Sequence, residues 1–387
     1  MMNYFLTEEQ QMIKETAARI ADEKIAPIAE EYDEEQKFPH EIVKILGDSD
    51  LFRVFIPEEY DGLGGGVFEM SIVVEELSRA CGGISLAYAA SGLGTIPIIL
   101  FGTEEQKKKY LPKLAAGEML AAFALTEPNA GSDAAAIITQ AKKDGDSYVI
   151  NGTKQWITNG GEAGIYTVIC LTDPTRGARG SSAVLIEKDT PGFEFGKKEN
   201  KMGIRASTTR ELIFQDCKVP TSNLLGREGM GFMVAMKTFD QSRPGVAAQA
   251  VGIAQGALEK AVDYSRERHQ FGKPVSSFQG VQFMLADMAT QVEAARALTY
   301  QAAKTVDAGE KNVAGISAMA KVFASDTAMK VTTDAVQVFG GYGYMKEYPV
   351  EKMMRDAKIT QIYEGTNQIQ REVIAMNLIK ASMRKKK

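Results

Sequence analysis

The sequence predicts an α+β protein of several domains, arranged in the order helices, strands, helices. Three observations carry this prediction. The 387-residue length exceeds the ~100–200 residues of a single typical domain. Apolar residues repeat with a helical period up to about residue 120 and again beyond about residue 230. Between these limits, short segments rich in Ile, Val, Tyr and Thr alternate with turn residues, a pattern typical of strands.

The first helical segment contains two start signals and one apolar stretch. Thr7-x-x-Gln10 and Thr103-x-x-Gln106 have the form of capping boxes, so we expect a helix after each. The stretch 86–101 is apolar but interrupted by Ser, Gly, Thr and Pro. A membrane span needs ~20 mostly apolar residues, so this stretch predicts a buried helix and loop and no membrane insertion.

The middle segment contains two candidate hairpin turns, Asp144-Gly145 and Asn151-Gly152. Turn signals recur every ~8–12 residues, as in an antiparallel sandwich or barrel. The last segment predicts long helices with breaks near Gly272, Gly309 and Gly340. We therefore expect three domains, with the limits 1–120, 121–230 and 231–387.

Composition excludes several classes of protein. The 45 basic and 50 acidic residues give a formal net charge of −5, which argues against a nucleic-acid binder. Three scattered cysteines and two histidines supply neither a disulfide framework nor a metal site, so we expect no metal. The cysteine pattern and the absence of a leader pattern in MMNYFLTEEQ predict a cytoplasmic protein.

Four strings are candidate functional segments, and the residues alone leave the role of each open. The hydroxyl- and glycine-rich run 125–133 suits either a bound polar ring or phosphate, or a linker. Trp156, the one tryptophan, suits either a flat cofactor or a packed core. The run 340–343 lacks a dinucleotide-fingerprint context and is either a phosphate contact or a helix break. Glu364, among apolar and small residues, is either a base with a raised pKa or an exposed loop residue.

Taken together, these strings resemble the acyl-CoA dehydrogenase family of FAD-dependent enzymes, over essentially the whole chain. The matching motifs are Ala124–Asp133, Gln337–Tyr344 continued by Glu347, Lys352 and Asp356, and Ile362–Thr366. The resemblance implies an N-terminal α-helical domain, a middle antiparallel β domain and a C-terminal four-helix-bundle domain. It also implies FAD as the cofactor and a homo-oligomer, usually a tetramer made of two dimers.

The resemblance carries roles onto matching positions. Residues expected at the flavin end of FAD are Phe123, Leu125, Thr126, Ser132, Trp156, Thr158, Thr366 and Gln368. Residues expected at the adenine end of an FAD bound mainly by a neighbouring subunit are Arg268, Phe271, Gln279, Gln337, Val338, Gly340 and Gly341. Residues expected to contact the acyl-CoA are Ser132, Phe239, Asp240, Arg243 and Gly365.

The implied reaction is α,β-dehydrogenation of an acyl-CoA to the 2-enoyl-CoA, with Glu364 as the base. Some relatives carry the base at the position immediately before the arginine that matches Arg243. This chain has Ser242 there, which cannot act as a base, so the resemblance leaves Glu364 as the candidate base. This places the chain nearer the short-chain, medium-chain or small branched-chain members. The small residues of 87–92 leave room for a bulky or alicyclic acyl group, although Tyr88 in the same segment could equally close the pocket. Arg205 is either a contact for a distal carboxylate or a surface or CoA-side charge.

The expected partners are the acyl-CoA substrate and, as electron acceptor, electron-transferring flavoprotein; nucleic acid and membrane are not expected. Three alternatives lie within the same superfamily. An acyl-CoA oxidase is usually longer, and this sequence does not end in Ser-Lys-Leu. A DNA-associated flavoprotein would need a basic surface. A protein of this superfamily without enzymatic activity would not need Glu364 or the motifs expected to bind the flavin.

Overall fold

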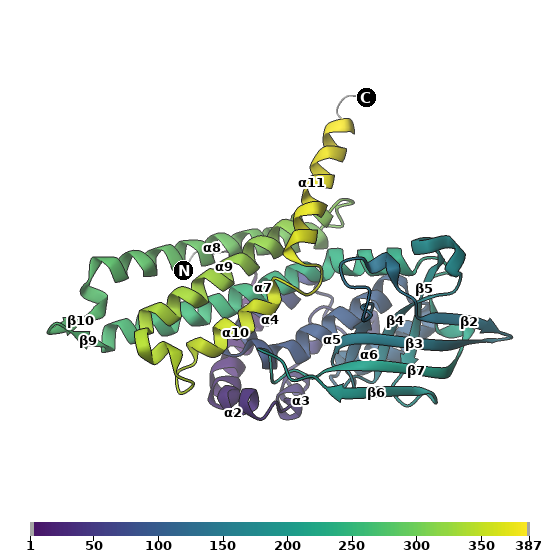
Figure 1. The fold of residues 1–387 in the computed structure, drawn as a ribbon, viewed down its shortest axis with the longest axis horizontal. Coiled ribbons are helices and arrows are strands. Elements are labelled where there is room, and N and C mark those ends of the chain that lie inside the picture. Colours follow the sequence, from purple (N-terminus) through teal and green to yellow (C-terminus); the bar gives the residue numbers. More distant parts are fainter. Residues whose placement is uncertain (1–3, 385–387) are drawn as a thin grey trace.

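The computed structural model describes residues 4–384 and has the predicted order of helices, strands and helices (Figure 1). The helices of the first part are α1 (Glu8–Ile20), α2 (Ala29–Glu34), α3 (His40–Asp48), α4 (Val67–Ala80), α5 (Gly82–Phe101) and α6 (Glu104–Ala115). Both predicted capping boxes are confirmed: Thr7 and Thr103 cap α1 and α6, each exchanging hydrogen bonds with the glutamine three residues on.

Helix α5 corrects the prediction of a helix followed by a loop, because it continues unbroken through Pro97. Its glycines allow close packing and do not interrupt the helix. A Cβ on Gly94 would lie 2.6 Å from the Ala122 nitrogen, so strand β1 can approach only a glycine there. By length and composition α5 could also cross a membrane, but 72% of its apolar window is buried inside the fold.

The middle part is one sheet, with eight strands within residues 4–384. The strands are β1 (Ala121–Ala124), β2 (Gln140–Asp144), β3 (Ser147–Thr158), β4 (Ile165–Leu171), β5 (Ser181–Glu187), β6 (Phe193–Lys198), β7 (Thr209–Pro220) and β8 (Leu224–Leu225). Their order is β6-β7-β3-β2-β4-β5-β8, with β1 paired to β4. Most pairs are antiparallel as predicted, but β4 runs parallel to β1 and, at one residue pair, to β2.

One of the two predicted hairpin turns is confirmed and the other is wrong. Asp144 pairs with Ser147, so Gly145 lies in a tight turn between β2 and β3. The Asn151-Gly152 dipeptide instead lies inside β3, where the register with β7 shifts. A Cβ on Gly152 would lie 2.7 Å from the Thr139 Cα, so this glycine permits a close backbone approach at a bulge.

The last part is a bundle with breaks where the sequence predicts them. Its elements are α7 (Gly231–Glu267), the β9–β10 hairpin (His269–Gln270, Lys273–Pro274), α8 (Gln279–Asp307), α9 (Ala314–Phe339), α10 (Val350–Thr360) and α11 (Asn367–Arg384). Helices α7 to α10 share an alanine-rich core, which confirms the four-helix bundle. Helix α11 leaves the bundle and projects from the molecule, while the β9–β10 hairpin marks the opposite end of the bundle from the sheet (Figure 1).

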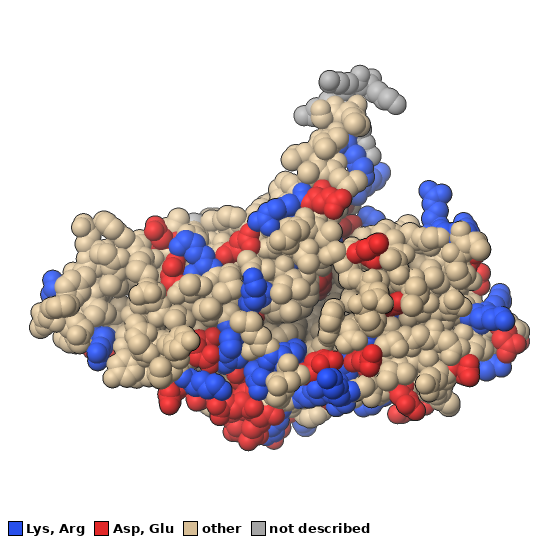
Figure 2. All heavy atoms as spheres, in the orientation of Figure 1, with Lys and Arg blue, Asp and Glu red and all other residues tan. Residues whose placement is uncertain are grey.

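Figure 2 shows basic and acidic side chains interspersed over one face of the molecule. Among the described residues on this face, no continuous basic stripe crosses the sheet or the bundle. Acidic side chains gather at the lower edge, and the end of the bundle is largely uncharged. This face therefore has no continuous basic field of the kind that binds a nucleic-acid backbone.

Candidate active site

The segment between α10 and α11 holds Glu364 in an unusual backbone conformation. Glu364 has φ +50° and Gly365 has φ +91°, both in the left-handed region that a glutamate rarely adopts. Gln370 on α11 donates to the carbonyls of Glu364 (3.0 Å) and Gly365 (2.9 Å). The Thr366 hydroxyl accepts from the Ile369 amide and caps α11, so a helix starts immediately after this segment. These bonds hold the segment, which we call the Glu364 loop (residues 361–366), in its strained shape.

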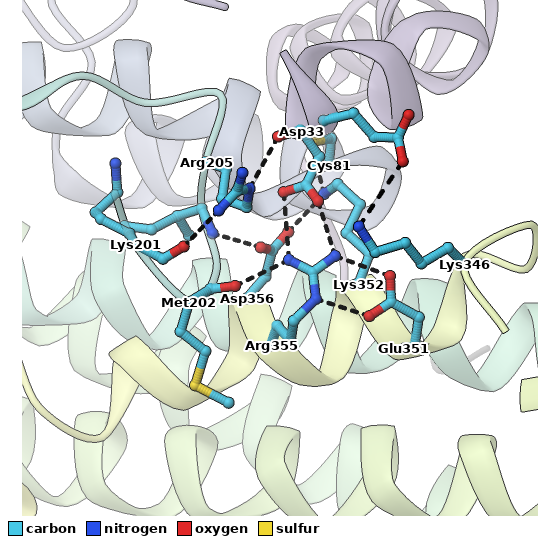
Figure 3. A network of polar contacts seen from close by, with 12 residues as sticks. Asp33, Cys81, Lys201, Met202, Arg205, Lys346, Glu351, Lys352, Arg355 and Asp356 are labelled. Carbon is cyan, nitrogen blue, oxygen red and sulfur yellow. Dashed lines mark hydrogen bonds and ion pairs between the residues drawn. The ribbon is translucent and has the colours of Figure 1, made fainter. Parts of the chain in front are cut away.

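Helix α10 enters the Glu364 loop from a junction of all three parts of the chain (Figure 3). Arg355 on α10 donates to the Asp33 carboxylate on α2 at 2.7 Å and to the Met202 carbonyl at 2.9 Å. Arg205 lies in the same network, where its Nε donates to the Asp33 carbonyl at 3.0 Å. It does not line the cavity that holds Glu364. Its guanidinium is occupied at this junction, also donating to Asn200 and the Lys201 carbonyl, a structural role that was not among those expected from the sequence.

A cavity of about 390 Å³ opens at Glu364 and is lined by all three parts of the chain. The predicted residues that line it are Phe123, Leu125, Thr126, Ser132, Trp156, Thr158, Phe239, Arg243, Glu364 and Gly365. The lining residues that were not predicted from the sequence include Met70, Val74, Val246, Gln249 and Tyr363. The predicted site residues thus come from segments up to about 240 positions apart in sequence, and only the fold brings them together.

The Glu364 side chain is partly open to this cavity and meets polar groups on α7. The Ser242 hydroxyl donates a hydrogen bond to its Oε2. Burial raises the pKa of Glu364, while the Ser242 hydrogen bond and the charges of Arg243 and Lys321 oppose that rise. The net effect is a raised pKa, so the carboxylate attracts a proton more strongly than an ordinary glutamate, as a base requires.

Arg243 and Asp240 form the polar part of the α7 wall. Arg243 is only 4% exposed, and its guanidinium lies 5.8 Å from the Phe239 ring centroid and 3.7 Å from the Asp240 carboxylate. Burial lowers the pKa of Arg243 and raises that of Asp240. Asp240 does not line the cavity, so its contact is with Arg243 and with Lys237. A buried, incompletely paired guanidinium suits an anionic ligand.

The sheet wall is aromatic, hydroxyl-bearing and rigidly supported. Trp156 lies at a bulge between β3 and β7, with φ +58° and an indole that is 59% exposed. Lys154, fully buried, donates to the Leu125 carbonyl (2.9 Å) and to the Glu127 carboxylate (2.7 Å). Glu127 also accepts from the amides of residues 138 and 139. This ion pair, which was not predicted from the sequence, ties the 125–133 loop to β3.

A second group of predicted residues lies far from the cavity. Arg268 caps the C-terminus of α7, about 37 Å along the helix from Arg243 at 1.5 Å per residue. Arg268, Val338, Gly340 and Gly341 line a separate open hollow at the β9–β10 end of the bundle. Phe271, Gln279 and Gln337 are exposed near the same end. Two further predicted residues lie close to Glu364 in sequence but do not line the cavity: Thr366, the last residue of the Glu364 loop, caps α11, and Gln368, in the first turn of α11, is exposed.

Of the α5 residues 87–92, which were expected to line the acyl pocket, only some line the cavity. Ala89 and Ala90 line it. Tyr88 does not: it is fully buried, and its hydroxyl donates to the Leu51 carbonyl at 3.0 Å. The cavity wall formed by α5 is therefore apolar, with two alanines between Leu86 and Leu93.

Models of the acyl-CoA dehydrogenase N-terminal, middle and C-terminal domains match residues 7–118, 122–217 and 229–379. The chain belongs to the acyl-CoA dehydrogenase family. It is 50% identical over 375 residues to the short-chain-specific acyl-CoA dehydrogenase of Clostridium acetobutylicum, covering 97% of this chain and 99% of that one. The structure of butyryl-CoA dehydrogenase from Megasphaera elsdenii superposes with a TM-score of 0.95 at 48% identity, covering 98% and 100% of the two chains. The structural comparison thus confirms the three-part fold.

FAD is the cofactor of this acyl-CoA dehydrogenase. A further matched structure, 30% identical with a TM-score of 0.92 and covering 97% and 99% of the two chains, is that of PigA with FAD and proline. The residues present fit a flavin: an exposed indole, two threonines and apolar side chains line the cavity. A Cβ added to Gly340 or Gly341 would meet no atom within 4 Å, so the backbone there is open to a phosphate-bearing ligand.

Proposed function

We propose that this enzyme dehydrogenates a short- to medium-chain, branched or alicyclic acyl-CoA to the 2-enoyl-CoA, with Glu364 removing the α-proton. One observation carries the proposal. The Glu364 carboxyl shares a single cavity with Thr126, Trp156 and Thr158, the residues expected at the flavin. A substrate between them would present its α-carbon to a carboxylate on one side and its β-carbon to an electron acceptor on the other.

The α-hydrogen of a thioester is weakly acidic, so the base needs help from its surroundings. Burial raises the pKa of Glu364, which strengthens its attraction for a proton. The amide of Glu364 has no protein acceptor within residues 4–384. That amide would donate to the thioester oxygen and stabilise the charge that develops as the proton leaves. FAD, when bound, accepts the β-hydride.

Two groups of residues would hold FAD. Phe123, Leu125, Thr126, Ser132, Trp156, Thr158, Thr366 and Gln368 would contact the flavin end within one subunit. Arg268, Phe271, Gln279, Gln337, Val338, Gly340 and Gly341 would contact the adenine end. The cavity at the flavin group is lined by the first half of α7 and the hollow at the adenine group by its C-terminal end, which supports an FAD shared between two subunits. We therefore propose a dimer at least, and by family resemblance a homotetramer.

Ser132, Phe239, Arg243 and Gly365 would contact the acyl-CoA, with Arg243 as the cation for its anionic part. Asp240, which does not line the cavity, would act through its contact with Arg243. The acyl group would lie against the apolar wall that includes Ala89, Ala90 and Gly245. The similarity to the short-chain-specific enzyme of Clostridium acetobutylicum and to butyryl-CoA dehydrogenase supports a small acyl group. We propose electron-transferring flavoprotein as the electron acceptor and the cytoplasm as the location.

An anaerobic reduction assay tests the proposal. Purified holoenzyme is mixed with linear, branched, dicarboxylic and alicyclic acyl-CoAs, and flavin bleaching is recorded. The wild type is expected to bleach with at least one small acyl-CoA, and Glu364→Gln to retain FAD and ligand binding while losing most of the reduction. Substantial reduction by Glu364→Gln would reassign the base.

Aerobic turnover separates the dehydrogenase from an oxidase. An oxidase would release stoichiometric hydrogen peroxide without a protein acceptor, whereas we expect slow peroxide formation and fast turnover with electron-transferring flavoprotein. A DNA-associated or non-catalytic flavoprotein would leave every acyl-CoA unoxidised.

A further inference from the structure

We propose that Lys321 is a positioning residue for the general base: its buried amine fastens the Glu364 loop to α9 and thereby directs the Glu364 carboxyl into the cavity. This inference rests on the proposed function of Glu364. Lys321 is fully buried in the first half of α9, which packs against α7, α10 and α11. It does not line the cavity and so does not contact the substrate.

The bonds made by Lys321 lie directly beside the base. Its Nζ donates to the Gly365 carbonyl at 2.9 Å and to the Asn367 Oδ1 at 3.0 Å. Asn367 is the first residue of α11, and its amide group also contacts Ser325 and Asp326 on α9 at 2.9 and 2.8 Å. The amine therefore ties both the end of the Glu364 loop and the start of α11 to one rigid helix.

The hydrogen bond from Lys321 to the Gly365 carbonyl helps to hold the loop in its strained backbone conformation. The positive φ values of Glu364 and Gly365 persist only if surrounding contacts hold them. Within residues 4–384, the Gly365 carbonyl receives two side-chain donors, one from Gln370 within α11 and one from Lys321. Of these two, only Lys321 connects that carbonyl to a helix of the bundle. Elsewhere in the loop, Arg243 on α7 donates to the Glu364 carbonyl at 3.4 Å and Gln361 donates to Asp326 on α9 at 2.7 Å, so the Lys321 bond adds a tie at Gly365 to those that already hold the loop to the bundle. A small rotation of the loop would displace the carboxyl, and displacements near ~1 Å can cost about 100-fold in rate.

Lys321 also acts on Glu364 through its charge. Burial lowers the pKa of Lys321 to about 7, and the positive charge of Arg243 on α7 lowers it further. The negative charges of Glu364 and of Asp326 on α9 act in the opposite direction and raise this pKa. Asp326 is itself paired with Arg371 on α11 at 2.6 Å. In its charged form Lys321 lowers the pKa of Glu364. Loss of this charge therefore favours the protonated, inactive form of the base.

Two substitutions and one control separate the bond from the charge. Lys321→Met removes both. Lys321→Gln keeps a donor and removes the charge. Ser325→Ala removes a neighbouring contact to Asn367 but neither the bond to Gly365 nor a charge. The measurements are kcat and KM for the best acyl-CoA, the pH profile of kcat/KM, FAD content, and hydrogen exchange of residues 361–367.

For Lys321→Met we expect kcat to fall about 10- to 100-fold, with KM and FAD content nearly unchanged. The acid limb of kcat/KM should move to higher pH, and exchange in residues 361–367 should become faster. Lys321→Gln should recover part of kcat but keep the displaced acid limb. Ser325→Ala should keep the wild-type acid limb and lose at most about twofold in kcat.

The proposal is overturned if Lys321→Met keeps wild-type kcat and acid limb, or if Ser325→Ala reproduces its full effect. If Lys321→Met does not fold, Lys321→Gln decides: an unmoved acid limb and unchanged exchange overturn the proposal. Failure of the proposed function has a different signature, namely undiminished reduction by Glu364→Gln. In that case hydrogen exchange alone still reports whether Lys321 holds the loop.

Discussion

The buried ion pair between Lys154 and Glu127 leads to a sharp stability prediction. Both side chains are almost inaccessible, at 0% and 3% exposure, and their charged atoms lie 2.7 Å apart. Lys154→Met leaves the Glu127 carboxyl buried without its cation. Removing one partner of a buried pair costs about 3–5 kcal/mol. Glu127 retains the amide donors of residues 138 and 139, at 2.7 and 3.0 Å, so we expect the lower end of that range, about 3 kcal/mol.

The assay is the midpoint of urea unfolding of the holoenzyme, with FAD release recorded in parallel. Lys109→Met is the matched control, because Lys109 pairs with Glu187 at 2.6 Å but both side chains are about half exposed. Exposed pairs contribute about 0–1 kcal/mol, so the control midpoint should barely move. Lys154→Met should also release FAD more readily, since Lys154 holds the Leu125 carbonyl at the sheet wall of the cavity.

The pH dependence has a definite sign. Burial raises the pKa of Glu127, but the charge and hydrogen bond of Lys154 and the bonds from residues 138 and 139 outweigh it, so the folded pKa is lowered. The stabilisation is therefore present above the unfolded pKa of about 4.3 and is lost as the pH falls through the folded pKa. Equal midpoint shifts for Lys154→Met and Lys109→Met would refute the reasoning.

Two further predictions concern the cavity and the distant hollow. Ser242→Ala removes a hydrogen bond that lowers the pKa of Glu364, so the acid limb of kcat/KM should move to higher pH in a steady-state pH profile; an unmoved limb would show that the hydroxyl does not tune the base. Arg268→Ala should weaken FAD retention, measured by flavin release on dilution, more than it weakens acyl-CoA affinity, because Arg268 lies at the far end of α7 from Arg243. The reverse order would contradict its place at the adenine end of FAD.

Local patterns made several elements predictable. A capping box satisfies orphan amides with side chains three residues apart, so Thr7 and Thr103 indicate their helices without tertiary help. The Asp144-Gly145 turn is equally local. Asn151-Gly152 carries the same turn chemistry, but pairing with β7 overrides it, because the neighbouring strand satisfies the backbone there and the glycine admits Thr139.

The amino-acid sequence by itself determined the family motifs, the candidate base and the order of helical and β segments, because these depend on residue type and short-range spacing. Tertiary structure decided which groups surround the base. Ser242 lies 122 positions from Glu364 and Lys321 lies 44 positions from Gly365, and only helix packing brings them to the loop. Helix α9 has two lysines, Lys321 and Lys330, and no local pattern distinguishes the buried Lys321 from the exposed Lys330. Charge and hydrogen bonding act over a few ångströms in space, whatever the separation along the chain, and that is why the chemistry of the site had to be read from the fold.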